Sequence, residues 1–156
     1  MEIERKYLLS SLPSHKVLGK GKLISQGYIS AGEPEVRMRS KANTFYLTVK
    51  SGYGLKRGER EAEIPSAAFR RLWPTTVGRR IRKTRYAVSD RALTWEIDQY
   101  YGPLKGLHTA EVELHNTRQK VVIPSFLSVV RDITDDPRYK NKNLATRGLP
   151  QRQRRR

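Results

Sequence analysis

Apolar and polar residues alternate along most of the chain, in short runs rich in β-branched and aromatic residues. Turn signals separate these runs, for example at residues 31–34 and 41–43. Side chains of a strand point alternately to two faces, so this period of two predicts strands with two different faces. Eight strands are predicted, over residues 2–9, 26–30, 36–40, 45–50, 59–64, 80–88, 93–101 and 109–116.

Helical periods are confined to three short segments. One is predicted at 66–73, between Pro65 and Pro74, and a second at 125–131. A third is predicted from near Thr134 to about Ala145. We therefore expect a mainly β domain over 1–147, an eight-stranded antiparallel barrel or sandwich covered by a few short helices. Residues 148–156 are expected to form a basic, disordered tail.

Composition narrows the chemistry. Charged residues make up 30% of the 156 positions, above the usual ~25%, so the core must be small. The chain has no cysteine, which excludes disulfides, thiolate zinc sites and cysteine nucleophiles and favours hard metals with oxygen ligands. No apolar run reaches the ~20 residues of a membrane span, and residues 1–6 do not resemble a signal peptide. We expect a cytoplasmic protein with no membrane partner.

The net charge of +17, from 32 Lys and Arg against 15 Asp and Glu, indicates a polyanionic partner. The charges lie on one face of the predicted strands, and eight of the 15 acids form four same-face pairs. This face comprises Glu2, Glu4, Lys6, Arg37, Arg39, Lys50, Glu61, Glu63, Lys83, Arg85, Glu96, Asp98, Glu111 and Glu113. The other face is apolar and includes Met38, Trp95 and Ile97.

Two interpretations of these faces stand side by side. An ordinary barrel would bury the apolar face and leave the charges in water. Solvated faces usually mix the two signs, however, because like charges side by side repel each other. A divalent cation would satisfy the paired carboxylates and a polyphosphate the paired bases. The alternative is therefore an inverted barrel whose narrow, charged lumen holds one small ligand.

Residues 2–6, Glu-Ile-Glu-Arg-Lys, resemble the E-x-E-x-K signature of the CYTH superfamily, the triphosphate tunnel metalloenzymes. The similarity continues in order through the charged pairs to residues 138–141 and covers about residues 1–146. Within the superfamily the chain resembles the small bacterial inorganic triphosphatases. The resemblance implies an eight-stranded antiparallel closed tunnel with the charges inside and a C-terminal plug helix. It implies metal-dependent hydrolysis of inorganic triphosphate to pyrophosphate and phosphate.

The resemblance also implies roles for particular residues. Glu2, Glu4 and Glu113 would bind a first divalent ion, Mg²⁺ or Mn²⁺, and Glu111 a second, water-activating ion. Phosphate oxygens would be bound by Arg37, Arg39, Lys50, Lys83 and Arg85, with Arg138 and Lys140 closing one tunnel end. Lys6 and Lys83 would be catalytic residues, and Lys6, near the metal-bound end of the substrate, would stabilise charge or relay a proton. The remaining tunnel-lining acids would be Glu61, Glu63, Glu96 and Asp98.

Other functions stay open. Thiamine triphosphatase, nucleoside triphosphatase or class IV adenylate cyclase activity would use the same ring of charges. A nucleic-acid-binding β-barrel is compatible with the net charge, but it has no use for four acid pairs on the face that carries the bases. We therefore expect a small polyanionic substrate rather than a nucleic acid, and leave room for a homodimer. The three histidines and the Gly52-Tyr53-Gly54 turn are not expected to be catalytic.

Overall fold

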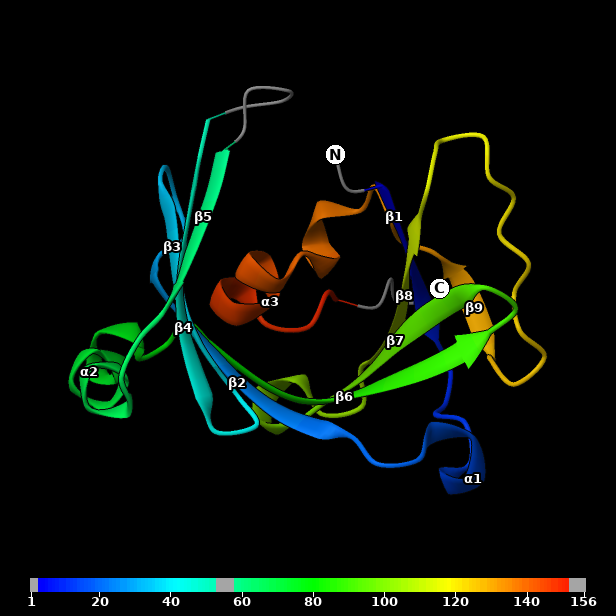
Figure 1. The fold of residues 1–156 in the computed structure, drawn as a ribbon, viewed down its shortest axis with the longest axis horizontal. Helices are drawn as coiled ribbons and strands as arrows, with labels where there is room; N and C mark the ends of the chain where they lie inside the picture. The colour runs from blue at the N-terminus through cyan, green and yellow to red at the C-terminus, as the bar shows by residue number, and fades with distance from the viewer. Residues whose placement is uncertain (1–2, 53–57, 152–156) are drawn as a thin grey trace. The chain divides into compact units, whose positions relative to one another are not determined.

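The computed structural model describes residues 3–52 and 58–151, and it is mainly β (Figure 1). Within these residues, nine strands follow the sheet order β5-β4-β3-β2-β6-β7-β8-β1-β9, and seven of the strand pairs are antiparallel. The strands are β1 (Ile3–Leu9), β2 (Lys22–Ser30), β3 (Glu35–Lys41), β4 (Thr44–Ser51), β5 (Gly58–Glu63), β6 (Arg80–Asp90), β7 (Leu93–Tyr100), β8 (His108–Leu114) and β9 (Val129–Asp132).

The helices are short. The α-helices are α1 (His15–Leu18), α2 (Ser66–Leu72) and α3 (Asn141–Arg147), and the 3₁₀ turns are η2 (Trp73–Thr76), η3 (Gly102–Leu104) and η4 (Pro137–Tyr139). Helix α2 begins directly after Pro65, whose fixed φ suits the residue before a first helical turn. Among the described residues, no helix is long and apolar enough to cross a membrane.

All eight predicted strands are confirmed, with shifted ends. Strand β2 begins four residues before the predicted start at 26, and β6 continues to Asp90. The turn after β6 therefore falls on Arg91 and Ala92, which both have positive φ. The ninth strand, β9, makes the predicted count of eight wrong. In the strand order β5 and β9 are the two ends, so hydrogen bonds among the described strands do not close a ring.

Two helix predictions need correction. The helix predicted at 125–131 is wrong, because Val129–Asp132 is a strand that pairs with β1. Its β-branched residues Val129 and Val130 suit a pleated surface. The predicted third helix starts late, since α3 begins at Asn141 after the η4 turn. Pro137 has no backbone N–H and disfavours a helical conformation at Asp136, so a helix from Thr134 cannot run through it.

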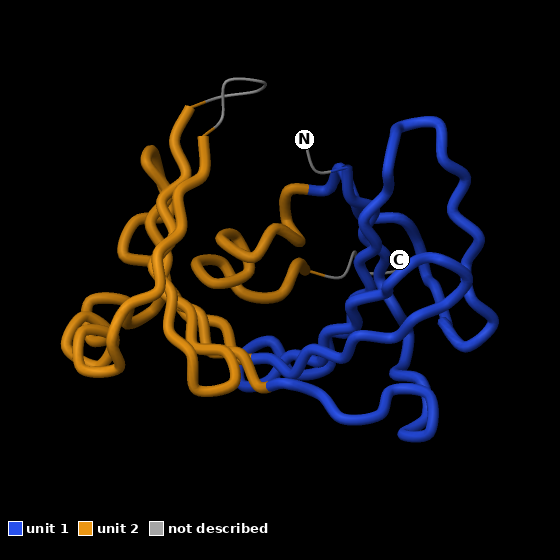
Figure 2. Tube along the Cα trace, viewed as in Figure 1, with its two compact units in different colours: residues 1–22, 83–136 blue, residues 23–82, 137–156 orange. Residues whose placement is uncertain are grey.

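The chain divides into two compact units (Figure 2). Unit 1, residues 1–22 and 83–136, has a core on the apolar face of β1, β7 and β8. Trp95 and Ile97 are fully buried there, and the rings of Tyr7 and Trp95 lie 5.8 Å apart. The apolar face predicted for these strands is thus confirmed as core.

Unit 2 consists of residues 23–82 and 137–156 and includes β2–β5, α2 and α3. Phe69 of α2 packs on Phe45 of β4, with ring centroids 4.9 Å apart. The η2 turn lies directly on β2 at Gly27, where a Cβ atom would come within 2.6 Å of Thr76 Oγ1. Glycine is therefore required at this close approach.

Candidate active site

Strand register gathers the charged residues of unit 1 on one face. Glu4 lies opposite Glu113, and Lys6 lies opposite Glu111 on the neighbouring strand. Glu111 in turn lies opposite Glu96. Residues directly opposite on antiparallel strands have Cβ atoms about 4.5–5.5 Å apart, so these side chains interact.

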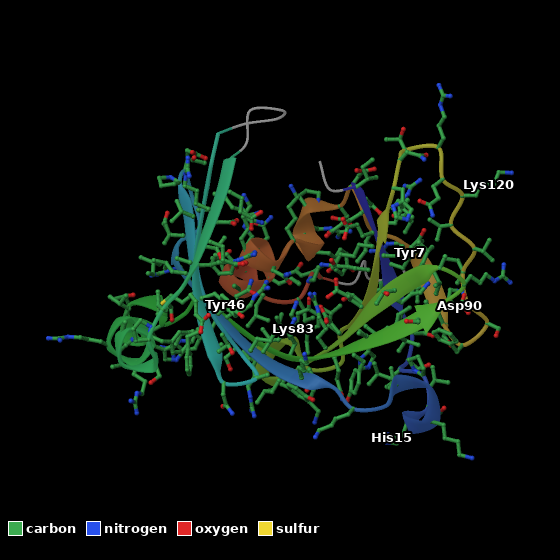
Figure 3. All side chains as sticks on the ribbon, viewed as in Figure 1. Tyr7, His15, Tyr46, Lys83, Asp90 and Lys120 are labelled. Atoms are coloured by element: carbon green, nitrogen blue, oxygen red, sulfur yellow. The ribbon has the colours of Figure 1, made fainter. Side chains whose placement is uncertain are left out.

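A buried ion network forms the centre of this face. Lys83, which is labelled in Figure 3, donates a hydrogen bond of 2.8 Å from Nζ to Asp98 Oδ2, and both side chains have no exposed surface. Arg85 donates two hydrogen bonds to Asp98, of 2.8 Å from Nε and 2.9 Å from Nη2. A third, from Nη1 to Glu96 Oε2, is 2.8 Å long. The two carboxylates hold the guanidinium plane in one orientation.

Burial and ion pairing shift the pKa values in this network. Burial lowers the pKa of Lys83 to about 8, although Asp98 beside it acts in the opposite direction. Burial would raise the pKa of Asp98, but Lys83 and Arg85 outweigh it and hold that pKa well below its usual range. Asp98 is therefore ionised at neutral pH, and Lys83 changes its charge near pH 8.

Glu111 connects this network to β1. Its Oε1 lies 3.6 Å from Lys6 Nζ and 3.9 Å from Arg85 Nη2. Two residue pairs further along the strands, on the same face, Glu4 and Glu113 lie opposite each other, and both are exposed. A hollow of about 410 Å³ lies at this acidic end, lined by Glu96, Glu113, Thr94, His115 and neighbouring aliphatic side chains.

Two facing carboxylates fit a divalent ion, because like charges directly opposite each other destabilise a strand pair unless a cation lies between them. Glu4 and Glu113 are such a pair. Within the described residues, no group of three or more His, Asp or Glu side chains is placed to hold a metal. Glu2, the third predicted ligand, lies outside the described residues. The ligand set therefore stays a prediction.

Unit 2 has a charged face of its own. Arg39 Nε donates a 2.8 Å hydrogen bond to Gln26 Oε1, and Gln26 Nε2 donates one of 2.7 Å to the Tyr28 hydroxyl. Arg37 lies 3.8 Å from Glu59, and its buried Nε has no acceptor among the described residues. A buried guanidinium N–H without an acceptor is costly, and a phosphate oxygen would satisfy it.

The other predicted residues of unit 2 lie on β4, on β5 and in the segment that leads into α3. Lys50 is opposite Glu59 and Glu35. Glu61 accepts a 2.8 Å hydrogen bond from the Thr48 hydroxyl, and Glu63 lies opposite Tyr46. Arg138 lies in η4 and Lys140 directly precedes α3, and both are exposed. That they close a tunnel end stays a prediction.

Sequence reasoning missed the neutral members of these faces. Gln26, Tyr28 and Thr48 are buried beside the arginines of unit 2, and Tyr100 and Thr109 are buried beside Lys83 and Asp98. Gln26 and Tyr28 alternate in the same period as the charged pairs, which is the signal that could have identified them. Residues 53 and 54 of the glycine turn and residues 152–156 of the tail lie outside the described residues.

The two faces belong to a mainly β protein, with partly buried bases suited to a polyanion and paired carboxylates suited to a cation. An inorganic triphosphatase of Nitrosomonas europaea is 37% identical over 150 residues, covering 92% of this chain and 96% of that protein. An inorganic triphosphatase of Acetivibrio thermocellus is 37% identical over 146 residues, covering 92% of each chain. No family model matches the chain.

The solved structures agree with these relatives. The crystal structure of an inorganic triphosphatase matches with a TM-score of 0.73 and 33% identity, covering 94% of this chain and 95% of the other. A protein from Pyrococcus furiosus, at 18% identity and a TM-score of 0.53 over 76% of this chain and 81% of its own, shares the fold. The chain belongs to the CYTH superfamily, in the family of the bacterial inorganic triphosphatases.

Proposed function

We propose that this protein hydrolyses inorganic triphosphate to pyrophosphate and phosphate with Mg²⁺ or Mn²⁺, in the cytoplasm. The observation that carries the proposal is the placement of bases on a partly buried polar face, above all Arg37, whose buried Nε has no acceptor in the described part of the chain. The names of the two relatives support the choice of substrate. In this proposal the charged faces line a closed tunnel, as the family resemblance implies.

Phosphoryl transfer needs positioning and charge neutralisation more than covalent chemistry. Arg37, Arg39, Lys50 and Arg85 would bind phosphate oxygens, and Glu2, Glu4, Glu111 and Glu113 would hold the metal. A divalent ion bound there would neutralise phosphate oxygens and lower the pKa of an attacking water. Asp98 and Glu96 would fix Arg85 in its binding orientation, through the three hydrogen bonds that its guanidinium donates.

A substrate panel tests this function. Purified protein should release phosphate and pyrophosphate in equal amounts from triphosphate when Mg²⁺ or Mn²⁺ is present, and excess EDTA should abolish the release. ATP and thiamine triphosphate in the same assay distinguish the alternative activities of the superfamily. Failure to cleave triphosphate with either metal, over about pH 6 to 10, would overturn the proposal.

Lys83 predicts a pH dependence of the reaction. Its pKa of about 8 means that the side chain is charged below that pH and neutral above it. If neutral Lys83 accepts a proton from the attacking water, kcat/KM should rise as the pH passes through about 8. Lys83→Arg keeps the charge at every pH, so this variant should lose the rise. An identical profile in variant and parent would exclude Lys83 as the proton acceptor.

A further inference from the structure

A second basic feature lies away from the charged faces, in residues 70–80 of unit 2. Arg70-Arg71 and Arg79-Arg80 flank seven residues without charge, Leu-Trp-Pro-Thr-Thr-Val-Gly. The longer stretch 64–89 contains seven Lys and Arg residues and no acid. We call residues 70–80 the arginine-flanked tip. No acidic residue within residues 64–89 balances the positive charge of this tip.

The tip is fixed to the apolar side of the unit 2 sheet. Phe69 packs on Phe45, and the ring of Trp73 stacks on Phe69 at 5.0 Å. Thr76 and Trp73 lie directly on Gly27 of β2. Arg39 is hydrogen-bonded to Gln26, the neighbour of Gly27, on the opposite face of β2. The tip is thus separate from the proposed phosphate-binding face.

Two of its arginines are held in place by three backbone carbonyls and one threonine hydroxyl. Arg79 donates to Tyr28 O at 2.9 Å and to Thr75 O at 2.6 Å. Arg80 donates to Thr76 Oγ1 at 3.0 Å and to Trp73 O at 2.8 Å. A guanidinium has five N–H donors, so each keeps three for an external anion. Because these hydrogen bonds already hold the two arginine side chains, the side chains lose less conformational entropy when they bind an anion.

Apolar side chains are exposed between the two arginine pairs. Val77 is 65% exposed and Leu72 is 39% exposed, and Arg70, Arg71 and Arg80 are exposed beside them. Aliphatic residues flanked by arginines match the boundary between lipid headgroups and acyl chains, where both kinds of side chain are satisfied.

RNA fits the same surface less well. Single-stranded nucleic acid binds by stacking its bases on free aromatic faces. The Trp73 ring is not free, because it stacks on Phe69 and the Arg80 guanidinium lies 4.5 Å from the centroid of the Trp73 ring. Val77 and Leu72 would gain nothing from a phosphate backbone.

We propose that the arginine-flanked tip is a docking surface for an anionic phospholipid bilayer. The arginines bind lipid phosphates, and Val77 and Leu72 enter the headgroup layer. From the sequence we expect no membrane partner, because no apolar run is long enough to span a membrane. Binding at the membrane surface needs no such run, so that expectation does not apply to this surface. The surface is independent of triphosphate hydrolysis.

Vesicle sedimentation tests the proposal on the full chain. The protein should bind vesicles of phosphatidylcholine mixed with phosphatidylglycerol, and not pure phosphatidylcholine, at an ionic strength of about 0.15 M. Arg70→Gln with Arg71→Gln should weaken binding roughly thirtyfold, from about 1 kcal/mol for each arginine near an anionic surface. Val77→Ser should weaken binding further, and this loss should persist when salt is raised.

Matched control variants distinguish the effect of the tip on vesicle binding from the effect of the overall charge of +17. Lys16→Gln with Lys20→Gln removes the same charge from another exposed segment, and Val130→Ser removes another exposed valine. Both controls should bind vesicles nearly as the parent does, and every variant should still cleave triphosphate at the parent rate. Equal weakening by the lysine and arginine pairs would overturn the proposal. The proposal would also be overturned if the protein bound RNA through Arg70 and Arg71 and did not bind vesicles.

Discussion

Replacing Glu4 with Gln is expected to lower the turnover of triphosphate at least about a hundredfold while the protein stays folded. Glutamine keeps the shape of the side chain but removes the negative charge that a divalent ion requires. Because Glu4 faces Glu113 across the strand pair, the substitution also relieves repulsion between like charges. The melting temperature of the metal-free protein should hold or rise while activity collapses.

Asp135→Asn is the matched control for Glu4→Gln. It also neutralises an exposed acid, in a segment outside the charged face. Turnover and its dependence on Mg²⁺ concentration should be those of the parent. Parent-like turnover in the Glu4→Gln protein at every Mg²⁺ concentration would show that Glu4 is not a metal ligand.

Asp98→Asn is expected to give the largest loss of stability of any single charge removal in the chain. It leaves Lys83 and Arg85 without the carboxylate that accepts three of their hydrogen bonds, of 2.8 to 2.9 Å. Removing one partner of a buried ion pair typically costs about 3–5 kcal/mol, because the remaining charge is desolvated and uncompensated. Urea denaturation at pH 7 measures this loss, and triphosphate turnover should fall with it.

A double-mutant cycle and a pH series check the cause of that loss. In a Lys83→Met background, Asp98→Asn should cost clearly less, because the uncompensated ammonium is gone. The depressed pKa of Asp98 means that its contribution to stability is present above the unfolded-state pKa and is lost as the pH falls below it. The stability gap between parent and variant should therefore narrow in acid. A loss below about 1 kcal/mol at pH 7 would show that the pair is not needed for folding.

The strands could be predicted from the sequence because their signal is local. Alternation with a period of two is visible in any window of six residues, and all eight predicted strands are present. Strand β9 has only four residues, and its partner β1 lies more than 110 residues earlier, so nothing nearby indicates it. The start of α3 depends on Pro137, which prevents a helix that begins near Thr134 from continuing through it.

The site was predictable only in part for a related reason. Same-face pairs such as Glu111 and Glu113 can be read from alternation, but which acid meets which base depends on strand register. Nothing in the sequence shows that Asp98 lies between Lys83 and Arg85. Neutral residues such as Gln26 and Thr48 carry no charge to mark them, and only their burial beside Arg39 and Glu61 reveals them.

The close approach at Gly27 limits how this chain can change in evolution. Any side chain there would meet Thr76 at 2.6 Å and the Trp73 ring at 2.9 Å. Trp73 in turn supports Arg80, so a change at one position of β2 requires matched changes at positions far along the chain. In a library randomised at 27, 73 and 76, surviving clones should keep glycine or replace it only together with smaller residues at both other positions. Replacement of Gly27 therefore needs several simultaneous substitutions, and we do not expect it to occur through single substitutions.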